Sequence, residues 1–153
     1  MIKSSPLKRI GTVAGAFSAA VLLTITQASA ATAEVERAYD VNGPADWNQW
    51  LCAGSGVGPV RACFTWDGDW IQIRDGKSDG SSAVMDWEVR DSSNNSILRY
   101  GAIFNADGAF TTRYKNKDFP ETNTTLRFRA CLGHWSTKLI TAGTCSAWVN
   151  TTP

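Results

Sequence analysis

The chain lacks most of the residues and motifs on which familiar catalytic sites depend. Its 153 residues include one histidine, His134, and no His-Glu-x-x-His, Walker loop or dinucleotide fingerprint. The segment Gly54-Ser55-Gly56 is not the Gly-x-Ser-x-Gly of a nucleophile elbow. A lone histidine beside a strand is usually a hydrogen-bonded surface residue. We therefore predict that the protein is not an enzyme and has no catalytic residues.

An excess of charge of either sign is also missing. Lys and Arg number 15 and Asp and Glu 14, which gives a formal net charge of +1. Because proteins bind nucleic acid by neutralising phosphates with basic residues, no nucleic-acid partner is expected. The 13 glycines follow no three-residue period, which excludes collagen, and a hydrophobic content of 43% is too high for disorder. The length fits a single domain.

The first thirty residues have the composition of an export signal. Three basic residues (Lys3, Lys8 and Arg9) precede the uncharged, mostly apolar run Ile10–Ile25, and small residues follow as far as Ala30. Cleavage near Ala30 would leave a secreted, extracellular protein. A membrane anchor is the alternative, but Gly, Ser, Thr and Gln dilute the run that a spanning helix needs. The mature form is therefore expected to have no membrane association.

Beyond the signal peptide, the sequence pattern predicts an all-β domain. Residues 31–46 have no strong period and are predicted to form a flexible N-terminal arm, and 47–153 form the single domain. From Val60 onwards apolar and polar residues alternate, turn residues recur, and no helical period is sustained. The fold class is therefore an antiparallel β-sandwich, or a small barrel, of seven to eight short strands. The predicted strands are 60–67, 70–75, 83–90, 97–105, 109–115, 124–132, 138–141 and 145–150, with 97–105 and 109–115 forming a hairpin.

Four cysteines in an exported chain indicate disulfides. Three pairings are possible, and the spacing favours Cys52 with Cys63 and Cys131 with Cys145. Zinc would need closer cysteine pairs than the chain contains. Cys63 and Cys131 fall on the polar sides of their predicted strands, so the bridges are expected outside the core.

Seven tryptophans suggest a ligand-binding surface. Alternation places Trp66 and Trp87 in the core, whereas Trp70 and Trp148 fall on polar strand faces. Outward-facing aromatic rings can stack on sugar rings or anchor a protein partner. The alternative is that they only cover the edges of a thin sandwich. The ligand-binding candidates are Trp70, Trp148, Trp135, Trp47 and Trp50.

Acidic residues suggest two further sites. Asp-Gly turns flank the short strand 70–75, and calcium favours such loops, although Lys77 lies within one of them and Asp-Gly is common in any turn. The candidate calcium ligands are Asp67, Asp69, Asp75 and Asp79. Asp86 and Glu88 lie two apart on one strand, at a separation that glycoside hydrolases use. Arg90 continues the same row, so a charged surface with cross-strand partners is the favoured interpretation.

These features predict a binding or surface-interaction module of unknown ligand, without a cofactor unless calcium binds. An extracellular glycan or a protein is the expected class of partner. One alternative is a carbohydrate or cell-wall-binding module that uses the outward tryptophans. Another is a secreted protease inhibitor, with the segment Gly54–Val60 as its exposed loop. A small glycoside hydrolase is the least favoured.

Several segments of the mature chain resemble the small secreted two-disulfide β-sandwich proteins of actinomycete bacteria. The resemblance covers most of residues 50 to 150. It rests on an Ala-rich export signal, an Asp-Gly loop, Arg61-Ala62-Cys63-Phe64, Phe128-Arg129-Ala130-Cys131 and Cys145-Ser146-Ala147-Trp148. These motifs are structural, so the resemblance implies a fold and a location but no activity.

Overall fold

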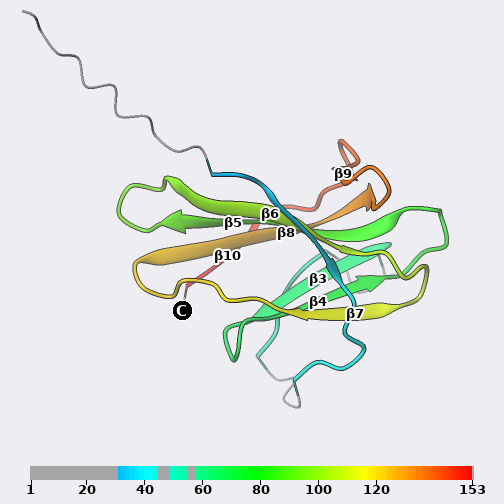
Figure 1. Ribbon diagram of the computed structural model, residues 1–153, viewed down its shortest axis with the longest axis horizontal. Coiled ribbons are helices and arrows are strands. Elements are labelled where there is room, and N and C mark those ends of the chain that lie inside the picture. The colour runs from blue at the N-terminus through cyan, green and yellow to red at the C-terminus, as the bar shows by residue number, and fades with distance from the viewer. Residues whose placement is uncertain (1–30, 45–48, 55–57, 153) are drawn as a thin grey trace, which may run out of the picture.

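The computed structural model describes residues 31–44, 49–54 and 58–152, which form two sheets packed face to face (Figure 1). The predicted signal peptide and Trp47 lie outside the described residues, as does much of the suspected inhibitor loop. Among the residues described, no helix is long and apolar enough to cross a membrane. The strands are β1 Glu34–Ala38, β2 Leu51–Ala53, β3 Val60–Thr65, β4 Trp70–Asp75, β5 Ser82–Asp91, β6 Ile97–Asn105, β7 Thr112–Asn116, β8 Thr124–His134, β9 Leu139–Ile140 and β10 Val149–Thr151.

The two sheets confirm the predicted all-β class. The six-stranded sheet has the order β1-β6-β5-β8-β10, with β9 also pairing with β8, and the four-stranded sheet has the order β2-β3-β4-β7. Each of the eight predicted strands overlaps an observed one, and β4 and β6 have the predicted bounds. Strands β1 and β2 were not predicted. Every pairing is antiparallel except that of β1 with β6.

Strand β1 corrects the prediction of a flexible arm over residues 31–46. It runs parallel to β6, from Glu34 opposite Gly101 to Ala38 opposite Asn105. This approach requires a glycine, because a Cβ on Gly101 would collide with the carbonyl oxygen of Glu34 and with the ring of Trp87. The arm was a wrong prediction because parallel pairing with a distant strand leaves no local signal in five residues.

The predicted hairpin of 97–105 with 109–115 was also wrong, because β6 and β7 belong to different sheets. The chain crosses between the sheets at Asn105, which is fully buried. Its side-chain amide donates to the carbonyl oxygens of Ile73 in β4 (3.1 Å) and of Thr111 (3.0 Å). These bonds connect the crossing point to β4 and to the segment that leads into β7, and they satisfy the buried side-chain amide of Asn105.

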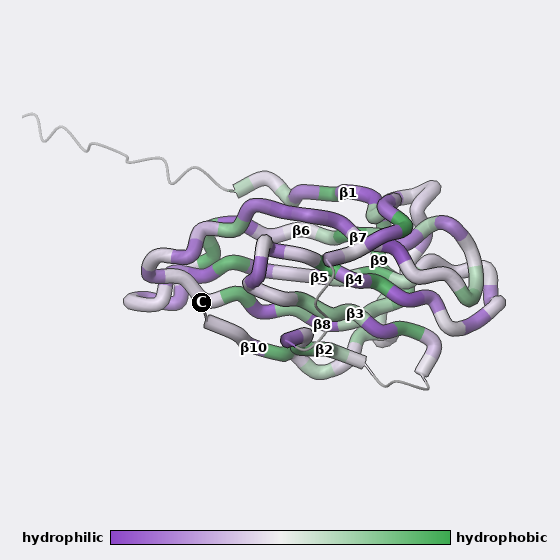
Figure 2. The backbone as a smooth tube through the Cα atoms, turned by 90° about the horizontal axis from the view of Figure 1, so that it is seen from below, coloured by the Kyte–Doolittle hydropathy of each residue, from purple (hydrophilic) through white to green (hydrophobic). Residues whose placement is uncertain are grey.

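The main hydrophobic core fills the space between the two sheets. Its largest members are aromatic, with Phe119 packed edge-on against both Phe64 (5.6 Å between ring centroids) and Trp87 (5.1 Å). Figure 2 shows hydrophobic segments in the interior strands, whereas β7 is hydrophilic. A second, smaller cluster lies on the outer side of the six-stranded sheet, beneath β9; its buried members are Val84, Ala102, Phe104 and Cys131.

Both predicted disulfide pairings are confirmed. Cys52 and Cys63 lie directly opposite each other on β2 and β3, and Cys131 of β8 is bonded to Cys145. Neither bridge belongs to the core between the sheets, in agreement with the predicted polar faces. Cys63 and Cys131 are nevertheless fully buried.

Candidate functional site

The outer side of the six-stranded sheet gathers charged and aromatic side chains into one surface. In β5, Met85, Trp87 and Val89 belong to the core, so Asp86 and Glu88 point outwards. The register then places Arg129 and Arg127 of β8 beside them, and Ala102 and Tyr100 of β6 on their other side. We call this surface the ladder face and define it by Asp86, Glu88, Tyr100, Arg127, Arg129 and Trp148.

Ion pairs link the two central strands of the ladder face. Nε of Arg129 donates to Oδ2 of Asp86, and Nε of Arg127 donates to Oε2 of Glu88, both at 2.8 Å. Glu88 also accepts from Nε of Arg90 at 2.8 Å. Burial raises the pKa of Asp86 against the opposing effect of Arg129. Burial also acts to raise the pKa of Glu88, but its two arginines outweigh it and lower that pKa.

Trp148 lies against both arginines of the ladder. The centroid of its ring is 4.4 Å from Cζ of Arg127 and 4.3 Å from Cζ of Arg129, within the range of cation–π contacts. Each guanidinium group therefore contacts a carboxylate and an indole ring. These contacts fix the arginine side chains, which would otherwise be long and mobile.

A shallow groove of about 230 Å³ continues the ladder face toward β1. Val35 and Tyr100 line it from β1 and β6, and Leu139 and Ile140 line it from the β8–β9 hairpin. Asp86 contributes a carboxylate to this mostly apolar lining. Tyr100 is 37% exposed, so part of its side chain remains available for contact. The groove thus combines apolar walls with two charged residues, Asp86 and Lys138, as small-ligand sites commonly combine apolar walls with a few polar groups.

The structure does not bring the five candidate tryptophans together. Trp70 lies on the opposite side of the molecule, on the outer face of the four-stranded sheet, because its strand neighbour Ile71 is in the core. Trp50 packs near Tyr114 on that sheet, at 6.5 Å between ring centroids. Trp135 covers Phe104 of the smaller cluster at 5.7 Å. Trp148 alone belongs to the ladder face, and Trp47 lies outside the described residues.

The four candidate calcium ligands do not form one site. Strand β4 separates Asp67 and Asp69 from Asp75 and Asp79. Asp69 accepts the N–H of Phe119 (2.9 Å), and Asp75 and Asp79 accept N–H groups within their own turn. Burial raises the pKa of both Asp69 and Asp75. The contacts of Asp75 and Asp79 are those of aspartates that organise turns, whereas Asp69 holds the distant segment at Phe119.

In the described part of the chain, one group of residues of metal-binding types has ligand atoms close enough together to share an ion. It consists of Asp86, Cys131 and Cys145. The two sulfur atoms are joined in a disulfide, so they cannot act as thiolate ligands.

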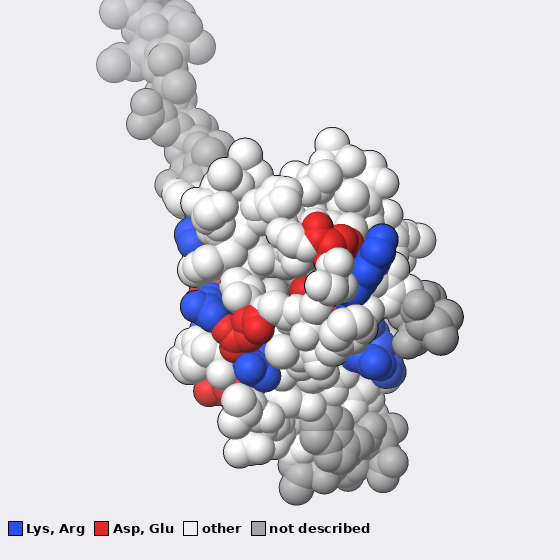
Figure 3. Space-filling model, turned by 90° about the vertical axis from the view of Figure 1, so that its right-hand side faces the viewer, with Lys and Arg blue, Asp and Glu red and all other residues white. Residues whose placement is uncertain are grey.

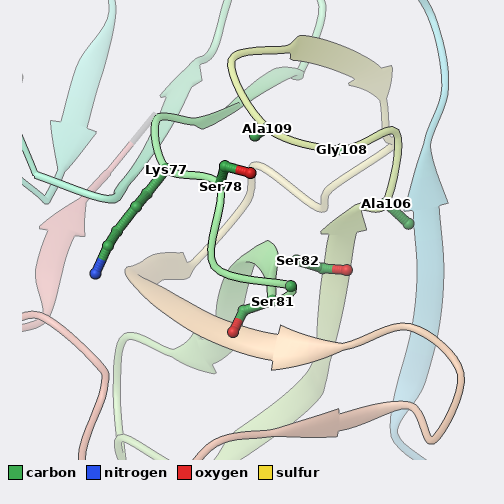
Figure 4. Close-up of a pocket in the computed structure, with 8 residues that line it drawn as sticks. Lys77, Ser78, Ser81, Ser82, Ala106, Gly108 and Ala109 are labelled. Carbon is green, nitrogen blue, oxygen red and sulfur yellow. The ribbon is translucent and has the colours of Figure 1, made fainter.

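A larger recess, of about 310 Å³, lies at one end of the sandwich between the β4–β5 and β6–β7 loops. Figure 3 shows basic and acidic side chains beside one another at this end, around a largely uncharged centre. Serine, glycine and alanine dominate the lining, and Lys77 extends away from Ser81 and Ala109 (Figure 4). With no aromatic ring and no carboxylate in its lining, this recess offers fewer specific contacts than the ladder face.

Sequence reasoning had assigned Asp86 and Glu88 to a charged surface with cross-strand partners, and the ion pairs confirm that interpretation. It missed Tyr100, Arg127 and Arg129 as members of a site. The two arginines alternate with buried residues along β8, but only the register shows that they meet the carboxylates. His134 is exposed at the end of β8.

Comparison with known protein families, with curated proteins and with solved structures finds no match for this chain.

Proposed function

We propose that the protein is a secreted, non-enzymatic binding module that holds a glycan on its ladder face. One observation carries the proposal: a partly exposed aromatic ring, Tyr100, lies on the same face as a row of fixed carboxylate and guanidinium groups. Sugar hydroxyls bind such groups through hydrogen bonds, and the C–H face of a sugar ring packs on aromatic side chains.

In the part of the chain that the structure describes, the ladder face has a hydrogen-bond acceptor without a partner, which suits the hydroxyl groups of a sugar. Nε of Arg129 donates to Oδ2 of Asp86 and Nη2 lies 2.8 Å from the same oxygen, whereas Oδ1 has no hydrogen-bond partner among the described residues. Asp86 lines the groove, and a carboxylate oxygen without a partner can accept a hydroxyl hydrogen. Because the arginine and tryptophan contacts already order these side chains, a ligand would lose little side-chain entropy in binding them.

The proposed location outside the cell rests on two features. The first thirty residues have the pattern of an export signal. All four cysteines are in disulfides, and such bonds persist in oxidising, extracellular compartments. The resemblance to small secreted actinomycete proteins agrees with this setting.

Glycoside hydrolysis is the second candidate, favoured by the opposite pKa directions of Asp86 and Glu88. Two contacts argue against it. Each carboxylate is paired with an arginine, and both project from the same face of one strand rather than from opposite walls of a cleft. Release of reducing ends from a glycan, abolished by Asp86→Asn, would establish hydrolysis instead of binding alone.

Retention on insoluble polysaccharides, including cell-wall fractions, tests the proposal. Tyr100→Ala and Trp148→Ala should each weaken retention by at least about tenfold, a loss of roughly 1.4 kcal/mol. Trp70→Ala, on the opposite sheet, is the matched control and should retain binding. Thermal unfolding of each variant checks that the fold is intact. Retention that depends on Trp70 but not on Tyr100 or Trp148 would place the ligand on the other sheet and refute the proposed site.

A further inference from the structure

The two arginines of the ladder face have hydrogen-bonding capacity that the fold does not use. Nε and Nη2 of Arg129 are directed at Oδ2 of Asp86, and the same atoms of Arg127 at Oε2 of Glu88, all at 2.8 Å. Nη1 of each arginine has no hydrogen-bond partner within the described ranges. Both side chains are about 30% exposed. Each guanidinium group therefore offers donors to a ligand while its other edge is held in place.

The spacing of these donors is fixed by the strand. Arg127 and Arg129 are two residues apart on β8, so their side chains emerge from the same face about 6–7 Å apart. Trp148 contacts both guanidinium groups, which links the two positions through one rigid ring. A pair of oriented guanidinium groups at this distance is suited to anionic groups, because guanidinium donors match the geometry of carboxylate and phosphate oxygens.

The local charge also favours an anion. Arg90, Arg127 and Arg129 face only two carboxylates, Asp86 and Glu88, so the ladder carries a surplus of one positive charge. By contrast, the chain after its predicted signal has two more acidic than basic residues. The positive surplus is therefore local to this face, where it would attract an acidic polymer to the site.

We propose that the glycan bound by the ladder face is acidic, and that Arg127 and Arg129 bind its carboxylate or phosphate groups while Tyr100 packs against a sugar ring. This inference rests on the proposed glycan-binding function. It adds the ligand class and the two residues that select it. Uronic acids and phosphate-bearing cell-wall polymers share the required chemistry, so the test includes both.

The experiment compares the affinities of the full-length secreted protein for four soluble polymers. Two are acidic, polygalacturonate and a glycerol-phosphate wall polymer, and two are neutral, xylan and a β-1,3-glucan. At least one acidic polymer should bind about tenfold or more tightly than either neutral one. Its binding should weaken as salt rises from 0.05 to 0.5 M, because salt screens exposed charges on the roughly 10 Å scale of the Debye length. Equal binding of acidic and neutral polymers would overturn the inference.

Substitutions of single arginines test which residues bind the acidic polymer. Arg127→Gln and Arg129→Gln should each reduce affinity for the acidic polymer by about tenfold or more. The matched control is Arg74→Gln, an exposed arginine on the opposite sheet, which should change it less than twofold. Arg129→Lys keeps the charge but loses the planar fork, so it should lose a large part of the affinity. An equal loss in Arg74→Gln would show non-specific charge attraction and refute the assigned residues.

The polymer experiment distinguishes failure of the glycan-binding function from failure of the proposed ligand class. If none of the four polymers binds, both the glycan-binding function and this inference are refuted. If neutral polymers bind through Tyr100 and acidic ones do not, the function stands and the ligand class is wrong.

Discussion

Two clusters in this protein pair carboxylates with basic side chains, but the basic side chains differ in their exposure to solvent. The ladder face pairs Asp86 and Glu88 with arginines on the outer side of the six-stranded sheet. The second cluster, which we call the edge cluster, consists of Glu34, Glu36, Arg99, Lys115 and Lys117. There, Nζ of Lys117 lies 2.7 Å from Glu34 and 2.5 Å from Glu36, and 4.9 Å from the ring centroid of the core residue Trp87.

The clusters differ in the exposure of their cations. The side chain of Lys117 is 6% exposed, whereas those of Arg127 and Arg129 are 27% and 32% exposed. A cation that is withdrawn from water depends on its partners for stability and is closed to ligands. A partly exposed cation adds little to stability but remains available. The edge cluster therefore stabilises β1 against the core, whereas the arginines of the ladder face remain accessible to the proposed ligand.

The largest expected effect comes from removing the buried cation. Lys117→Met keeps the aliphatic stem but leaves the carboxylates of Glu34 and Glu36 without their shared partner. We expect a loss of about 2–3 kcal/mol in the free energy of unfolding, near the lower end for breaking a buried ion pair because the carboxylates are partly exposed. Denaturant unfolding measures this loss, and glycan affinity of the folded variant should not change.

Lys77→Met is the control for that variant. Its ammonium lies 3.9 Å from Asp79 and its side chain is 64% exposed, so its loss should change stability by less than about 0.5 kcal/mol. If the two lysine variants are equally stable, the edge cluster does not hold β1, and the contrast between the clusters fails.

Acid should weaken the edge cluster. The hydrogen bond from Arg99, aided by Lys117, lowers the pKa of Glu34 from 4.5 to about 2. A carboxylate with a lowered pKa contributes stability that is fully present above about pH 4.5 and is lost as pH falls toward 2. Asp69, Asp75 and Asp86, whose pKa values are raised, change stability in the opposite direction over the acid range, whereas Glu88, Asp91 and Asp107, whose pKa values are lowered, act as Glu34 does. Thermal unfolding between pH 6 and pH 2.5 should show a falling midpoint.

Glu34→Gln isolates this contribution from that of other carboxylates, including Glu88, whose pKa is also lowered. The variant should be less stable than the wild type at pH 6, and the difference should shrink as pH approaches 2.5. A constant difference across this range would show that Glu34 titrates as it does in the unfolded chain.

The edge cluster shows which kind of contact the sequence pattern does not predict. Period-two alternation located the strands of the sandwich because each strand buries one face, and cysteine spacing gave both disulfide pairings. The same reasoning missed β1, since Glu34 and Glu36 are stabilised by Lys117, some 80 positions away. Charged residues in a short segment indicate a solvated arm unless the distant partner is known.

The ladder face was partly predictable for a related reason. Alternation identified Asp86 and Glu88 as one row and placed Trp148 on a polar strand face. Whether Trp70 and Trp148 share a surface depends on which sheet each strand joins, and local patterns do not encode that. The groove beside Tyr100 needs β1 and the β8–β9 hairpin as well, so it emerges only from the complete topology.

Of the two clusters, the ladder face has the smaller expected change in stability. Arg129→Gln removes the partner of Asp86, but the arginine is about one-third exposed and the glutamine amide can still donate to the carboxylate. The free energy of unfolding should therefore fall by about 1 kcal/mol or less. Denaturant unfolding of this variant beside Lys117→Met compares the two clusters directly. A loss in Arg129→Gln as large as that in Lys117→Met would mean that the arginine is needed for folding rather than reserved for a ligand.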